Sequence, residues 1–98
     1  MEIKDVPEKG RFEARDEAGA LAGILTYQVT GQIVVYTHTS VEPGFERQGV
    51  GSALAQAAME DARAKSRTVV PICEFVLEWL KKHPEYESMV ARTTRHIK

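Results

Sequence analysis

The spacing of apolar residues along the chain changes near residue 48. Before that point apolar and polar residues alternate, which is the period of strands with one buried face. The predicted strands cover residues 11–15, 20–29 and 33–41. Turn residues at 16–19 and 30–32 separate them, and strands joined by such short turns predict an antiparallel meander.

The second half begins with a helical period. Small and apolar residues recur at helical spacing from Gln48 to about Lys65. Alanines on the packed face would let this helix approach a sheet closely. A short apolar run at 68–72 then predicts a buried strand whose pairing is interrupted at Pro71.

A second helix is predicted over 74–82. It should end at His83, because the residue before a proline avoids helical geometry, and Pro84 could begin a further short helix over 84–90. The strands on either side of the first helix should form a right-handed parallel crossover. The predicted fold class is therefore α+β, with helices packed on a mixed sheet.

Composition narrows the class of protein. A chain of 98 residues fits one domain, 1–98, and its net charge of -1 gives no field that would attract nucleic acid or an anionic membrane. No apolar run is long enough to span a membrane, and the polar start is not a secretory signal. One cysteine permits no internal disulfide, so we expect a cytoplasmic protein. No cluster has metal-ligand spacing, so no metal is expected, and an uncovered sheet edge would permit a homodimer.

The stretch EPGFERQGVGSAL, residues 42–54, is the strongest candidate for chemistry. A helix N-terminus preceded by glycines can bring backbone N–H groups up to a phosphate, and Ser52 adds a hydroxyl. The same glycines could equally serve only the turn. The chain has no Gly-Lys-Ser/Thr and so no P-loop, and glycines after a meander do not fit a dinucleotide fold.

Three motifs in order make the chain resemble the GNAT-type N-acetyltransferase superfamily, and in particular its short branch of about 100 residues. The superfamily signature, Arg/Gln-x-x-Gly-x-Gly/Ala before a long helix, aligns with residues 46–51. The short branch has HTEV, P-x-C-x-F/Y-V and HPEY, which align with HTSV at 38–41, PICEFV at 71–76 and HPEY at 83–86. The chain departs from these patterns at Glu46 and at Ser40.

The resemblance implies a GNAT-like fold and a site for acetyl-CoA. In such a site the pyrophosphate lies on the loop amides, and the pantetheine arm runs beside the end of the third predicted strand into a gap near 70–73. The cofactor-binding residues implied in this way are Thr39, Ser40, Val41, Arg47, Gln48, Gly49, Val50, Gly51, Ser52 and Cys73. The acceptor would be an amine, either a small molecule or a protein.

Two residues are candidates for catalysis. Cys73 falls at or near the start of the second helix, where the helix dipole favours a thiolate, although Glu74 opposes this. It could accept the acyl group or contact pantetheine, or it could be a small buried hydrophobe. His38, which should share a strand face with Tyr36 and Ser40, could be a general base or a structural histidine.

Other candidates have simpler interpretations. Phe75 and Trp79 lie one turn apart and fit core packing better than pantetheine contact. Tyr86 fits packing better than protonation of a leaving thiolate. The basic segment 91–98 could touch the 3′-phosphate of coenzyme A or form a solvated tail.

Two functions from different classes follow from these residues. The first is an acetyl-CoA-dependent N-acetyltransferase acting on an amine, by direct transfer or through Cys73. The second is a non-catalytic acyl-CoA-binding or protein-interaction module that retains only the cofactor cleft.

Overall fold

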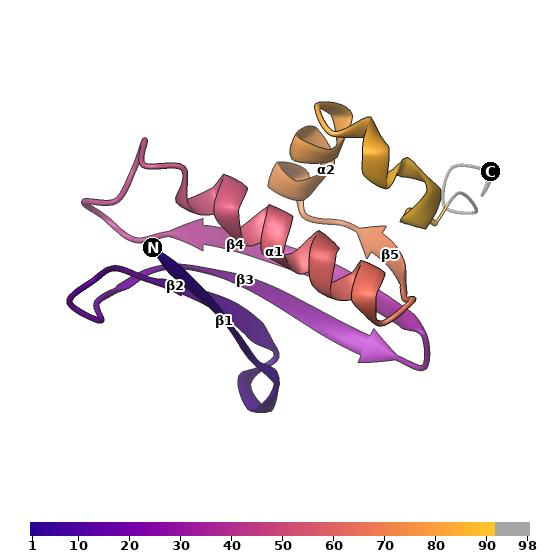
Figure 1. Ribbon diagram of the computed structural model, residues 1–98, viewed down its shortest axis with the longest axis horizontal. Helices are drawn as coiled ribbons and strands as arrows, with labels where there is room; N and C mark the ends of the chain where they lie inside the picture. The colour runs from indigo at the N-terminus through magenta and orange to yellow at the C-terminus, as the bar shows by residue number, and fades with distance from the viewer. Residues whose placement is uncertain (92–98) are drawn as a thin grey trace.

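The computed structural model describes residues 1–91. The basic segment 91–98, a candidate for contact with the 3′-phosphate of coenzyme A, lies almost wholly outside the described residues. The elements in chain order are β1 (Glu2–Val6), η1 (Pro7–Lys9), β2 (Arg11–Arg15), β3 (Leu21–Thr30), β4 (Ile33–Val41), α1 (Val50–Ala64), β5 (Thr68–Pro71), α2 (Glu74–Lys81) and η2 (Pro84–Met89). The strands form a five-stranded sheet in the order β1-β2-β3-β4-β5 (Figure 1). No helix in this part of the chain is long and apolar enough to cross a membrane.

The sheet is mixed, as predicted. β1 to β4 pair antiparallel, and β4 and β5 pair parallel across the α1 crossover. The antiparallel part of the sheet has one strand more than the three-stranded meander predicted from the sequence, because β1 precedes β2 and pairs with it. β1 is short and carries only two large apolar residues, Ile3 and Val6, so its alternation is too weak to be read as a strand.

Both α-helices lie on the same side of the sheet (Figure 1). The alanines of α1 that face the strands, Ala55, Ala58 and Ala62, are fully buried, which confirms the expected close approach. At Gly23 of β3 an added Cβ would lie 2.8 Å from both a methyl carbon of Val50 and the carbonyl oxygen of Ser40. The start of α1 therefore rests directly on the backbone of the sheet.

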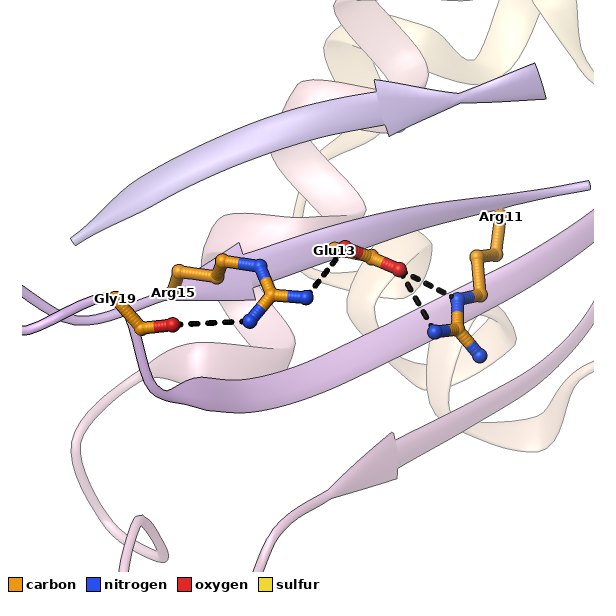
Figure 2. A network of polar contacts seen from close by, with 4 residues as sticks. All are labelled: Arg11, Glu13, Arg15 and Gly19. Carbon is orange, nitrogen blue, oxygen red and sulfur yellow. Dashed lines mark hydrogen bonds and ion pairs between the residues drawn. The ribbon is translucent and has the colours of Figure 1, made fainter. Parts of the chain in front are cut away.

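The opposite face of the sheet carries a charged network. Glu13 alternates along β2 with the core residues Phe12 and Ala14, so it points away from the helices. Glu13 is only 5% exposed, and its carboxylate pairs with Arg11 and Arg15, which lie on either side of it (Figure 2). This face is therefore polar, which is the usual arrangement for an antiparallel sheet covered on one side.

Candidate active site

β4 and β5 separate at Tyr36. Their ladder ends with Tyr36 paired to Pro71, and the Tyr36 carbonyl accepts hydrogen bonds from the N–H groups of Ile72 and Cys73, both at 3.1 Å. The chain then turns into α2, whereas β4 continues to Val41. We call this divergence, bounded by residues 37–41 of β4 and the turn into α2, the fork. Among the described residues no strand pairs with this stretch of β4 on the β5 side.

A β-bulge lies where the fork opens. Tyr27 pairs with Tyr36 but the residue before it in β3, Thr26, pairs with His38, so Thr37 is the extra residue. The hydroxyls of Thr26 and Thr37 lie 2.6 Å apart. A bulge adds one residue to one strand and therefore shifts the alternation of side chains beyond it.

This shift corrects the expected placement of His38. Thr39 pairs with the buried Leu25 and contacts Cys73, so it points to the helix side, and its neighbours His38 and Ser40 point to the other side. His38 therefore shares a face with Ser40 but not with Tyr36. It is exposed, and the sheet separates its imidazole from the Cys73 thiol; its role as a general base stays a prediction.

Cys73 is the N-cap residue of α2, in agreement with the sequence analysis. It is 7% exposed, and its Sγ lies 3.2 Å from the hydroxyl oxygen of Thr39 across the fork. The thiol thus reaches the open stretch of β4 from the opposite side of the divergence. Burial also fits the alternative of a small packed hydrophobe.

The loop before α1 has a defined shape. Gly49 caps the helix in the left-handed conformation, with φ of 76°, and Arg47 is left-handed as well, with φ of 66°. The Gly44 N–H donates to the Glu46 carboxylate at 2.9 Å, and the Gln48 amide donates to the Gly44 carbonyl at 3.3 Å. Glu46, the residue that departs from the superfamily signature, therefore stabilises the loop itself.

The backbone N–H groups at the start of α1 point out of the helix. From Gln48 to Ser52 none of them makes a short, well-aligned hydrogen bond within residues 1–91. Such a row of free donors, together with the positive end of the helix dipole, is suited to an anion. These residues could hold a phosphate.

The two glycines of GVG have different roles. A Cβ on Gly49 would meet nothing within 4 Å, so this glycine serves the left-handed backbone and leaves space at the helix end. A Cβ on Gly51 would lie 2.7 Å from the ring of Phe75. Gly51 is therefore required by the packing of α2 on α1. Ser52 is also engaged with α2, because its Oγ accepts a hydrogen bond from the Trp79 indole at 2.8 Å.

The other aromatic residues divide between core and surface. Trp79 and Tyr86 are buried, as predicted. The Tyr86 hydroxyl donates to the Glu60 carboxylate, and this hydrogen bond raises the pKa of the phenol and leaves Tyr86 in a packing role. Phe75 is 42% exposed beside the start of α1, so the prediction that it is a core residue was wrong. The sequence did not predict its contact with Gly51 in the first turn of α1.

Comparison with known proteins gives the family. The profile of the GCN5-related N-acetyl-transferase family matches residues 11–89, which include every element from β2 to η2. The chain belongs to this family.

Solved structures agree with the assignment. The NMR solution structure of a GCN5-like N-acetyltransferase candidate from Staphylococcus aureus is 29% identical in sequence, with a TM-score of 0.69 over 92% of this chain and 87% of that one. The crystal structure of nourseothricin acetyltransferase is also 29% identical, with a TM-score of 0.52, but the match covers 60% of this chain and 36% of that longer one. No match was found among curated protein sequences.

The residues of this GCN5-related protein suit the group that the family generally uses, acetyl-CoA. Free amides are available for a pyrophosphate, and an unpaired strand edge is available for an extended arm with amide groups. A separate apolar groove of about 470 Å³ lies outside β5 and α2, and neither Thr39 nor Cys73 lines it. Within residues 1–91 no group of three His, Cys, Asp or Glu side chains could hold a metal ion.

Proposed function

We propose that this chain is an acetyl-CoA-dependent N-acetyltransferase that binds acetyl-CoA along the fork and transfers the acetyl group to an amine. The observation that carries the proposal is one juxtaposition. The unpaired edge of β4 and the free amides at the start of α1 flank a fork whose inner end holds the Cys73 thiol.

Each part of the site has a defined task in this proposal. The amides of 48–52 bind the pyrophosphate, and Arg47, which precedes them in the sequence, supplies a cationic side chain. The edge at Thr39, Ser40 and Val41 pairs with the pantetheine amides, as an added strand would. This arrangement directs the thioester towards Thr39 and Cys73, which are already in contact.

Two routes of transfer are open to these residues. In direct transfer the amine attacks the thioester carbonyl, loses a proton, and coenzyme A leaves as the thiol. In the relay the Cys73 sulfur attacks the carbonyl, a thioester forms on Cys73, and coenzyme A leaves as the thiol with the proton that Cys73 gave up. The amine then attacks the Cys73 thioester and restores the free thiol.

Binding is tested by placing a charge at Gly49. Gly49→Glu and Gly49→Gln have similar size and impose the same left-handed strain, and the side chain would enter open space, so they differ mainly in charge. We expect Gly49→Glu to bind acetyl-CoA about tenfold more weakly than Gly49→Gln in titration calorimetry, because a carboxylate near the phosphates costs Coulomb energy of that order. Equal affinities of the two variants, or no binding by the wild type, would refute the proposed phosphate site.

Catalysis is tested by intact mass and by release of coenzyme A thiol. A gain of one acetyl group that is absent in Cys73→Ala supports the relay. Amine-dependent thiol release that persists in Cys73→Ala supports direct transfer. Binding without amine-dependent release in either protein would support the alternative of an acyl-CoA-binding module.

A further inference from the structure

The position of Cys73 depends on how α2 is held. α2 has only eight residues and buries two large side chains, Val76 and Trp79. A helix of this length is not stable on its own, so its contacts with neighbouring elements fix it in place. Cys73 is the N-cap of this helix, and its N–H also donates to the Tyr36 carbonyl at 3.1 Å.

α2 is attached to the first turn of α1 at two points. The ring of Phe75 lies on the α-carbon of Gly51, where it fills the space that any larger residue would need. One turn along α2, the Trp79 indole N–H donates to the Ser52 hydroxyl oxygen at 2.8 Å. Phe75 and Trp79 are four residues apart, so both lie on one face of α2. We call this pair of contacts the helix clamp.

The exposure of Phe75 argues for a specific role. A residue that served only the core would be buried, but 42% of Phe75 is exposed. Leu77, on another side of the same helix, is exposed to nearly the same extent, 41%, and lines the groove away from the fork. The two side chains therefore differ chiefly in what they touch, and Phe75 touches the turn whose amides face outward.

We infer that Phe75 and Trp79 are positioning residues, which hold the Cys73 thiol against Thr39 by clamping α2 to the phosphate-binding turn of α1. This inference rests on the proposed function for its relevance to acetyl transfer. The clamp itself is a property of the free protein. The clamp fixes the position of the Cys73 thiol relative to the loop amides, so that a ligand held by the amides meets the thiol at a fixed distance.

The clamp is tested without any ligand, because Cys73 is the chain's single cysteine and Trp79 its single tryptophan. A buried thiol reacts only when the structure around it opens locally. We expect Phe75→Ala to raise the rate at which iodoacetamide alkylates Cys73 about tenfold. The reaction is monitored by the intact mass of the protein. Phe75→Leu keeps a large apolar side chain on Gly51 and should be alkylated at nearly the wild-type rate. The fluorescence emission of Trp79 should change in Phe75→Ala.

The matched control is Leu77→Ala, a truncation of equal exposure on the same helix. It should leave the alkylation rate and the Trp79 emission near those of the wild type. Thermal unfolding of each variant, measured in the same buffer, separates local opening from global unfolding. If Phe75→Ala and Leu77→Ala react equally fast, or if the rate follows only the global stability, the clamp is refuted.

The kinetic readout distinguishes the clamp from the proposed function. If the chain is an acetyltransferase, Phe75→Ala should lower kcat about tenfold or more, with a smaller change in the KM for acetyl-CoA, because misplacement of the reacting groups affects the chemical step most. A lower kcat without faster alkylation would refute the clamp and leave the enzyme intact. Faster alkylation in a protein that does not bind acetyl-CoA would support the clamp and refute the proposed function.

Discussion

Glu13 offers a test of how the uncovered face of the sheet is stabilised. Its carboxylate accepts from Arg11 Nε at 2.8 Å and from Arg15 at 3.0 Å, and a second Arg11 nitrogen lies 2.7 Å away. Arg15 also donates to the carbonyl of Gly19, so the network continues into the β2–β3 turn (Figure 2). The substitution Glu13→Gln keeps the shape of the side chain and one carbonyl oxygen, but removes the charge.

The expected loss of stability follows from these contacts. Hydrogen bonds to charged groups contribute about 1.5–3 kcal/mol net, and the partial exposure of both arginines places the loss near the lower part of that range, about 2 kcal/mol. The entropy of unfolding of a domain of this size is about 0.2 kcal/mol per kelvin, so the unfolding midpoint should fall by about 10 °C.

The pH dependence makes the prediction sharper. The hydrogen bond from Arg11 lowers the pKa of Glu13 below its ordinary value of 4.5, and burial opposes this only in part. Because the pKa is lower in the folded protein, the stability that Glu13 contributes is complete well above pH 4.5 and is lost as the pH falls through the folded value. The amide of the Glu13→Gln variant does not titrate, so the gap between wild type and variant should shrink as the pH is lowered.

Calorimetric unfolding from neutral pH down to about pH 3 measures this gap. The control is Glu17→Gln, which removes an exposed carboxylate two residues beyond Arg15 and should change the midpoint little. The reasoning is refuted if Glu13→Gln and the wild type have the same unfolding midpoint at neutral pH, or if the difference between their midpoints stays constant as the pH falls.

Two further substitutions test the contact between α1 and the sheet. Tyr36→Phe removes a buried hydroxyl that donates to a carbonyl of α1 at 2.6 Å, and should lower the free energy of unfolding in urea by about 1 kcal/mol. An unfolding midpoint and slope both equal to those of the wild type would contradict this. Gly23→Ala places a Cβ 2.8 Å from the Ser40 carbonyl oxygen, and should cost about 2 kcal/mol because strand backbone and helix must both shift. A variant of Gly23 as stable as wild type would show that α1 is not seated directly on β3.

Much of the fold can be predicted from periodicity. The change from alternation to helical spacing locates β2 to β5 and both α-helices to within about two residues, because these segments have one strongly apolar face. The family motifs, in turn, bring Cys73 to the start of α2 and place the glycine loop before α1. These features are local, so a single sequence contains them.

What could not be predicted depends on contacts between distant segments. β1 pairs with β2 through its backbone, and its short run of side chains barely alternates in hydrophobicity. The exposure of Phe75 and the packing role of Gly51 depend on the angle at which α2 meets α1, and no pattern within either segment specifies that angle. The exchange of faces at His38 depends on one unpaired residue, Thr37, in an otherwise regular strand.

That single residue accounts for the geometry of the candidate site. If Thr37 were paired, the alternation that places Tyr36 on the helix side would continue, and Thr39 would point to the uncovered face. The contact between Thr39 and Cys73 would then be lost, because the thiol approaches from the helix side. The turn of the chain into α2 opens the fork, and the bulge turns Thr39 towards the thiol.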